Sequence, residues 1–179
     1  MTHRKLSKLP NSEKKKEVKN VRNWLINTCN IPSKDVRGWR SPYLADDAQV
    51  RKYIEQAGYQ YDTSMPEFFN SNTSPSPGRR VWPHTLDKGI QMTKACRYFG
   101  NVNNCQANEK HNLYEIPMWM YQARSYKPAY KGLMDPPNAY KVLKAELDRN
   151  YKSHRAPIGI WTHSTSTGYL NKAYVVCFV

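Results

Sequence analysis

The first periodic pattern along the chain predicts an amphipathic helix that begins at a capping residue, Asn11 or Ser12, and runs to about Thr28. Apolar residues recur at helical spacing in this segment, and the lysines between them are expected to face water. The apolar stripe consists of Val18, Val21, Trp24 and Leu25. After the break at Ile31-Pro32-Ser33, residues 36–39 form a short apolar run that predicts a strand.

A second helix and strand follow after short links. Asp46 or Asp47 is placed to cap a helix over 48–57, and Gly58 is a typical residue for its C-terminal end. Residues 59–64 then predict the next strand. An alternation of helix and strand with short connections is typical of βα units and a parallel sheet.

The rest of the chain is less regular. Residues 65–80 are rich in proline and serine and predict a loop, as do residues 88–112. Residues 114–120 fit a strand or a helix. A third helix is expected at 138–152, after two prolines, and a buried strand at 158–162. The residues expected to point inward from the third helix are Val142, Leu143, Leu147 and Tyr151.

Length and composition predict one packed domain. The chain has 179 residues, of which 39% are hydrophobic and 12% aromatic, a content that disordered chains lack. No apolar run approaches the roughly 18 residues that a membrane span needs, so no membrane span is expected. The opening residues lead into lysines, so we expect no signal peptide in this chain.

The chain is basic, with 28 Lys and Arg against 14 Asp and Glu and a formal net charge of +14. Such a charge suits polyanions, but on a helix it is more often a solvated face. A nucleic-acid-binding protein is a third functional reading that rests on charge alone, and no nucleic acid partner is expected. Much of the excess lies near the N-terminus, at Lys5, Lys8, Lys14, Lys15, Lys16 and Lys19.

Four cysteines, Cys29, Cys96, Cys105 and Cys177, include no pair at the close spacing of a zinc finger. Cys96 and Cys105 flank a short polar loop, which favours a local disulfide; two free thiols are the alternative. Asn72-Thr73-Ser74 is a glycosylation sequence that matters only if the chain is secreted.

Polar residues follow two of the predicted strands. Arg40 to Tyr43 come after the strand at 36–39, and His163 comes after the strand at 158–162. Active sites of α/β barrels and open α/β sheets lie at the C-terminal ends of their strands. A single His after a strand is more often structural, but two such strand ends together indicate a functional edge.

Six segments in order resemble the polysaccharide deacetylases of the NodB-homology type, also called carbohydrate esterase family four. Within that family they are most similar to eukaryotic chitin deacetylase-like proteins. The segments are Thr2-His3-Arg4, Val36 to Leu44, Gly58 to Ser64, Trp82-Pro83-His84-Thr85-Leu86-Asp87 with the Cys96 to Cys105 loop behind it, Tyr114-Glu115-Ile116-Pro117-Met118, and Arg155 to His163.

The resemblance implies a distorted (β/α) barrel of seven strands. Residues 1–179 would form a single polysaccharide deacetylase domain, incomplete at its N-terminus, with 65–80 and 88–112 as loop insertions. The family's Thr-Phe-Asp-Asp segment, which supplies the catalytic base and one metal ligand, has no match in the chain. We therefore expect the chain to cover the C-terminal two-thirds of the domain.

The resemblance also implies a divalent metal, commonly zinc, held by one Asp and two His. Of these ligands only His3 matches, so the chain as written is expected to lose the metal. Arg40 matches the arginine that orients the base carboxylate, and Tyr43 matches the residue whose backbone N–H helps to bind the oxyanion. Pro42 would set the turn that aims this N–H.

Three further residues receive roles from the resemblance. His163 matches the general acid that protonates the departing amine, a task that suits an imidazole near neutral pH. Asp87 is expected to orient His163, and Trp82 is expected to form a wall of the acetyl pocket.

The favoured functional reading is a metal-dependent hydrolase that removes N-acetyl groups from chitin or a related N-acetylglucosamine polymer. The full-length protein would be secreted or held in the cell wall, and the fragment would be inactive. The alternative is a catalytically dead relative that binds polysaccharide. A Thr-Phe-Asp-Asp segment upstream would favour the enzyme.

Overall fold

The computed structural model describes residues 3–65, 82–89, 106, 108–118, 139–153, 155, 157 and 159. The chain divides into two compact units. The first joins residues 1–66 to 83–117, and the second joins 67–82 to 118–179. The grouping of all 179 residues into one deacetylase domain stays a prediction.

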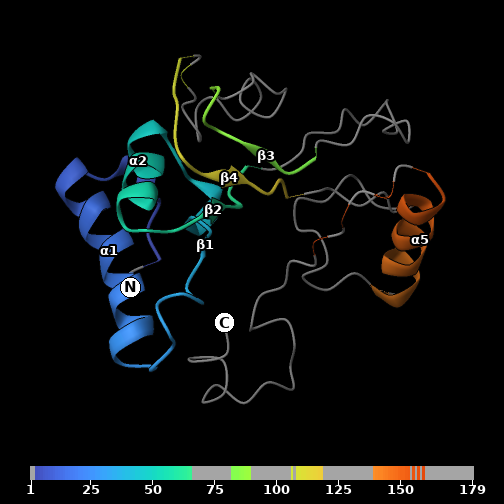
Figure 1. Ribbon diagram of the computed structural model, residues 1–179, viewed down its shortest axis with the longest axis horizontal. Helices are drawn as coiled ribbons and strands as arrows, with labels where there is room; N and C mark the ends of the chain where they lie inside the picture. Colours follow the sequence, from blue (N-terminus) through green and yellow to red (C-terminus); the bar gives the residue numbers. More distant parts are fainter. Residues whose placement is uncertain are drawn as a thin grey trace. The chain divides into compact units, whose positions relative to one another are not determined.

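The first unit is a mixed α/β structure built on a four-stranded sheet (Figure 1). The strand order is β1-β2-β4-β3; β1, β2 and β4 are parallel, and β3 runs antiparallel to β4. Helices α1 and α2 pack against each other beside this sheet. The elements are η1 (Leu6–Lys8), α1 (Asn11–Asn27), β1 (Gly38–Trp39), η2 (Pro42–Leu44), α2 (Ala48–Gln56), β2 (Tyr61–Asp62), β3 (His84–Thr85) and β4 (Tyr114–Glu115).

The predicted alternation of helix and strand is confirmed in this unit. Strands β1 and β2 pair in parallel across helix α2, as a βα unit requires. The segment from Tyr114, which fitted a strand or a helix, forms β4. Among the described residues of 88–112 there is no helix or strand, as expected of a loop. The predicted loop 65–80 and the predicted strand 158–162 lie outside the described residues, apart from Met65 and Gly159.

The ends of α2 are the predicted ones, whereas the start of α1 is not. Asp47 caps α2, because its Oδ1 accepts a hydrogen bond of 2.8 Å from the Val50 N–H. Gly58 ends the helix with a φ of 84°, which glycine adopts without strain. In α1 the capping position is held by Pro10, so the assignment to Asn11 or Ser12 is wrong. The Pro10 carbonyl accepts the first helical bond, from the Lys14 N–H.

Two side chains of α1 lie on unexpected faces. Lys14 is buried, and its Nζ is 2.6 Å from Asp47 Oδ2, so the prediction that this lysine faces water is wrong. The ion pair offsets the cost of burying the ammonium group. Trp24, which was assigned to the buried stripe, is exposed, while its neighbour Leu25 is buried.

The core of the first unit lies between the two helices and the sheet. Trp39 of β1 packs edge-on against Tyr59, with ring centroids 5.4 Å apart. The buried apolar residues are Leu6, Val18, Leu25, Val36, Trp39, Val50, Ile54, Tyr59, Met65, Leu86 and Leu113. These contacts hold the C-terminal ends of β1 and β2 next to each other.

Gly38 is required by the ring of its partner in the sheet. Gly38 stands opposite Tyr61, and a Cβ added at Gly38 would fall 2.2 Å from Tyr61 Cζ. We expect Gly38→Ala to lower the free energy of unfolding by about 1–3 kcal/mol, measured by urea denaturation. In a Tyr61→Ala background, Gly38→Ala is expected to lower the free energy of unfolding by clearly less, because the ring that the new Cβ would meet is gone. An equal cost in both backgrounds would contradict this explanation.

The second unit contains helix α5 (Ala139–Lys152), close to the helix predicted at 138–152. Between Leu143 and Lys152, where the side chains are described, Glu146 and Asn150 are buried, whereas Leu147 and Tyr151 are 56% and 65% exposed. The prediction that Leu147 and Tyr151 point inward is therefore wrong. Leu143 is partly buried, and the side chain of Val142 lies outside the described residues. The buried stripe is rotated by one residue, and the Glu146 carboxylate on it pairs with Arg149.

None of the helices in the described part of the chain is long and apolar enough to cross a membrane.

Candidate functional site

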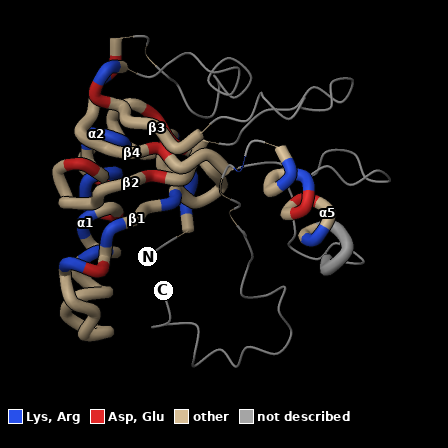
Figure 2. Tube along the Cα trace, turned by 45° about the vertical axis from the view of Figure 1, so that its right-hand side comes forward, with Lys and Arg blue, Asp and Glu red and all other residues tan. Residues whose placement is uncertain are grey.

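The carboxyl ends of three parallel strands meet at one edge of the sheet. Trp39, Asp62 and Glu115 stand in register across β1, β2 and β4. Figure 2 shows the acidic residues within β2 and β4. Loops that follow these strands are joined by hydrogen bonds from the Ser41 N–H to Ser64 Oγ (2.8 Å) and from Ser64 Oγ to Asp62 Oδ1 (2.6 Å). This edge is where a ligand site of a parallel sheet is expected.

Arg40 follows β1 directly and lies partly buried at this edge. Burial lowers the pKa of its guanidinium, and the charge of Asp62 opposes that effect. Arg40 is thus close enough to Asp62 to be influenced by a carboxylate of the same edge. Its predicted task, to orient a catalytic carboxylate, remains a prediction.

The turn after Arg40 has an unusual backbone. Pro42 is buried and begins η2, and Tyr43 and Leu44 have φ angles of 58° and 55°, a left-handed conformation that is costly for residues with a Cβ. The turn is closed by bonds from the Leu44 and Ala45 N–H groups to the carbonyls of Ser41 and Pro42. Among the described residues, no acceptor is bonded to the Tyr43 N–H. That N–H can therefore donate to a ligand, as the predicted oxyanion role requires.

His3 lies beside Tyr43. The two ring centroids are 4.7 Å apart, and Lys5 Nζ is 5.6 Å from the Tyr43 centroid. His3 thus lies near the turn that resembles the oxyanion site. The described residues do not fit a metal, because no three His, Cys, Asp or Glu side chains among them are placed to hold one.

The other predicted site residues are not brought to this edge by any described contact. Asp87 is exposed after β3 and accepts a hydrogen bond from Thr85 Oγ1, which lowers the pKa of its carboxyl. Trp82 is exposed and belongs to the second unit. Outside the described residues lie His163, Cys96, Cys105 and Asn72. Their predicted roles stay predictions.

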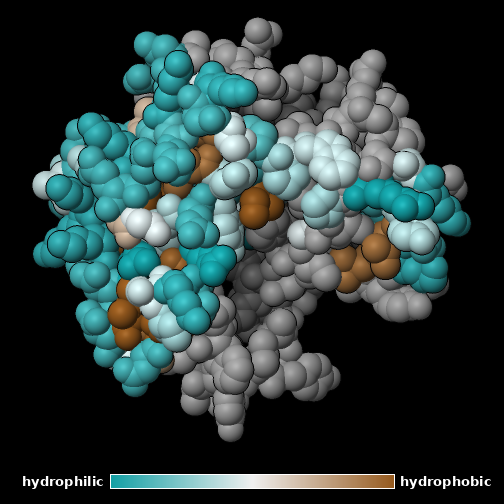
Figure 3. Space-filling model, in the orientation of Figure 1, coloured by the Kyte–Doolittle hydropathy of each residue, from teal (hydrophilic) through white to brown (hydrophobic). Residues whose placement is uncertain are grey.

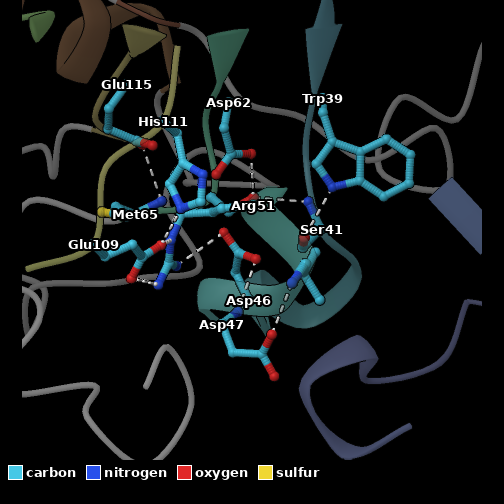
Figure 4. A network of polar contacts seen from close by, with 12 residues as sticks. Trp39, Ser41, Asp46, Asp47, Arg51, Asp62, Met65, Glu109, His111 and Glu115 are labelled. Atoms are coloured by element: carbon cyan, nitrogen blue, oxygen red, sulfur yellow. Dashed lines mark hydrogen bonds and ion pairs between the residues drawn. The ribbon is translucent and has the colours of Figure 1, made fainter. Parts of the chain in front are cut away.

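Sequence reasoning missed a buried polar network behind the strand ends, which Figure 4 shows around Arg51. Arg51 of α2 is completely buried. Its Nε and Nη2 donate to the two oxygens of Glu109 at 2.5 and 2.9 Å, and its Nη1 is 3.2 Å from Asp46 Oδ2. His111 Nε2 is 2.6 Å from Glu109 Oε1. The pattern offered no signal for this, because an arginine on an amphipathic helix is normally solvated.

The carboxyl groups of the network divide into two kinds. Burial alone would raise the pKa of Glu109, but hydrogen bonds from His111 and Arg51 outweigh it and bring that pKa to about 2. Burial raises the pKa of Asp46 and of Asp62, with the Arg51 charge opposing both shifts. Burial and the nearby Asp62 charge raise the pKa of Glu115 well above its usual value. Burial thus favours the neutral form of Asp46, Asp62 and Glu115, whereas Glu109 keeps its charge.

Glu115 predicts a dependence of stability on pH. A carboxyl whose pKa is raised by folding stabilises the protein fully below its unfolded pKa and loses that contribution as the pH rises through the folded pKa. We therefore expect Glu115→Gln to be more stable than the parent at pH 7, because the amide carries no charge. The difference in thermal midpoint should shrink toward about pH 4, near the usual glutamate pKa.

A matched control for Glu115→Gln is Glu13→Gln, a partly exposed carboxylate of α1 in a surface ion pair with Arg4. Surface pairs contribute little, so this variant should be no more stable than the parent at pH 7. Two results together would refute the assignment of a buried neutral carboxyl. The thermal midpoint of the parent would be the same at pH 7 and pH 4, and Glu115→Gln would have the same midpoint as the parent at both values.

Comparison with known proteins finds a distant relative of the chain. The fold is α/β, with a parallel strand edge that carries the Arg40 turn, and the chain is distantly similar to a deacetylase. That relative is chitin deacetylase 1 of Bombyx mori, which is 25% identical over 162 residues. The match covers 83% of this chain but only 28% of the relative. No family model matches the chain.

Proposed function

We propose that the chain forms part of an enzyme that removes N-acetyl groups from chitin or a related N-acetylglucosamine polymer. The observation that carries the proposal is the similarity to the chitin deacetylase over 83% of the chain. The Arg40 to Tyr43 segment supports it, because this segment lies at the carboxyl end of β1, beside His3, and no described residue accepts a hydrogen bond from the Tyr43 N–H.

The proposed chemistry assigns one task to each matching residue. Arg40 orients the carboxylate that takes a proton from water, and the Tyr43 N–H stabilises the oxyanion that develops on the acetyl group. His163 then gives a proton to the departing amine, and Asp87 holds the His163 ring in position. Pro42 sets the turn, and Trp82 shapes the acetyl pocket.

A metal is proposed only for a form of the protein that brings further ligands to His3. Zinc or another divalent ion would polarise the acetyl oxygen and activate water in that form. The described residues of this chain do not make such a site, and none of the steps above is routed through one.

The proposed setting is extracellular. A secreted chitin-type deacetylase would place Cys96 and Cys105 in an oxidising environment and make Asn72 a glycosylation site. The distorted barrel of the deacetylase type is also part of the proposal, with the parallel strands β1, β2 and β4 as a segment of its wall.

Acetate release from chitin oligomers tests the proposed function. We expect the 179 residues to release no acetate with added zinc, because only His3 matches a metal ligand and no residue matches the base. A longer form that carries a Thr-Phe-Asp-Asp segment upstream is expected to release acetate. Robust zinc-dependent release by the 179 residues would show that the metal site has been misplaced.

Binding to chitin beads separates the enzyme from its alternative. A longer form that binds chitin but releases no acetate under any metal condition would favour the catalytically dead polysaccharide-binding relative. A form that neither binds nor deacetylates chitin would overturn both readings.

A further inference from the structure

A cationic groove lies between α1 and α2, and none of the residues that line it has a role in the proposed deacetylation. Its volume is about 270 Å³, and its charged lining is Lys15, Lys19 and Arg22 of α1. The opposite side is formed by Tyr53 and Gln56 of α2. None of the described residues that line it is acidic, and the molecular face over α1 and α2 in Figure 3 is mostly hydrophilic.

The two lysines of this groove are not neutralised within the described part of the chain. Two other cations of the first unit, Lys14 and Arg51, have carboxylate partners in Asp47 and Glu109. Lys15 and Lys19 are exposed and form no ion pair with any described residue. Like charges four residues apart on a helix repel each other, so an anion bound between them would relieve an unfavourable arrangement.

Arg22 adds a preorganised cation at the same place. Its Nη2 donates to the Ser33 carbonyl at 2.9 Å, and its guanidinium lies 5.9 Å from the centroid of Tyr59. Its Nε is buried and has no hydrogen-bond partner. The hydrogen bond to Ser33 and the contact with Tyr59 thus hold the guanidinium in place at the groove, so little of its freedom would be lost when an anion binds.

We propose that this groove binds an anionic sugar unit of an acidic polysaccharide. The three cations suit a sulfate or carboxylate group, and the amides of Asn23 and Gln56 offer donors and acceptors for sugar hydroxyls. The volume lies just below the 300–1,000 Å³ typical of small-molecule sites, so the groove suits one ring and its substituents.

This ligand differs from the substrate proposed for the enzyme. Chitin is neutral and its deacetylated product is cationic, so a groove with three cations would not attract either. A nucleic acid is disfavoured because single strands bind by stacking bases on exposed aromatic rings. Here Tyr53 is half-buried, and Tyr59 is buried beneath Arg22. Binding of an acidic sugar in this groove therefore does not depend on whether the protein is a deacetylase.

The test is the binding of a fluorescent heparin hexasaccharide to the 179-residue chain at physiological salt. We expect Lys15→Glu with Lys19→Glu to weaken binding by about tenfold or more. The matched control, Lys16→Glu with Lys52→Glu, makes the same change of net charge at exposed lysines of α1 and α2 that do not line the groove. It should weaken binding by less than about threefold, since screened charges outside the groove contribute little.

Equal weakening of heparin binding in both double variants would show attraction to net charge alone and would contradict a binding site in the groove.

Lys15→Gln with Lys19→Gln gives a milder version of the test if circular dichroism shows that the charge reversal disturbs folding. Gln56→Ala should weaken heparin binding by about threefold and leave inorganic polyphosphate binding unchanged, since the lost amide would serve sugar hydroxyls. The sugar assignment would be overturned if a single-stranded RNA bound more tightly than heparin and if that RNA binding were lost in the Lys15→Glu, Lys19→Glu variant.

Discussion

Replacing Arg51 with Met is expected to lower the free energy of unfolding by about 3–5 kcal/mol. Arg51 is completely buried and is the cation that faces Asp46 and both oxygens of Glu109. Methionine fills similar space but leaves the Glu109 carboxylate without its bidentate partner in a buried site. The loss would be a large part of the 5–15 kcal/mol that a domain of this size usually has. Urea denaturation at pH 7 measures it.

The neighbouring residue provides the control. Lys52→Met makes the same change of charge one position along α2, at an exposed side chain, and should change stability by no more than about 0.5 kcal/mol. The loss in free energy of unfolding for Arg51→Lys is expected to fall between those for Arg51→Met and Lys52→Met. An ammonium keeps the charge but cannot donate to both Glu109 oxygens in the geometry of a guanidinium. Equal effects of the Arg51 and Lys52 substitutions would mean that the buried network contributes nothing.

Replacing His163 with Ala in an active longer form is expected to lower the rate of acetate release by roughly 10²–10⁴, the usual contribution of a general acid. This prediction rests on the proposed function, since the amine that leaves during deacetylation needs a proton. The parent rate should fall at alkaline pH as an imidazole loses its proton, and the variant should lack that limb of the profile. Acetate release followed across pH measures both effects.

His154→Ala is the matched control, a histidine nine positions earlier that no motif assigns to catalysis. It should retain the parent rate and the alkaline limb. Added imidazole is expected to restore part of the activity of the His163 variant, because a free imidazole can supply the missing proton. An unchanged pH profile in the His163 variant would remove that residue from the proposed chemistry.

The helices and the parallel strand pair were accessible from the sequence because their causes are local. The Asp47 cap and the Gly58 terminator of the helix at 48–57 act within a few residues, and each is found where the pattern placed it. The turn after β1 was also found correctly, because polar residues that follow a strand of a parallel sheet must lie at its carboxyl edge. Its left-handed backbone at Tyr43 and the contact with His3 were not encoded in any spacing.

The partners of charged residues required the tertiary structure. Lys14 and Arg51 are polar residues of predicted amphipathic helices, a pattern that places polar residues in water, and Glu109 lies in a predicted loop. Lys14 and Arg51 are buried because carboxylates 33 and 58 residues away along the chain pair with them. A buried charge depends on what faces it, and periodicity in one helix carries no information about another segment.

The sequence by itself determined the three α-helices, their boundaries within a residue or two and the βα order, and it carries the distant similarity to a deacetylase. Only the tertiary structure decided which side of each helix meets the rest of the protein, as Trp24 and Leu147 show by their exposure. It also decided that Asp46, Asp62 and Glu115 share one buried environment. The reason is physical: hydrogen bonds within a helix are set by neighbours in the chain, whereas burial and charge pairing are set by neighbours in space.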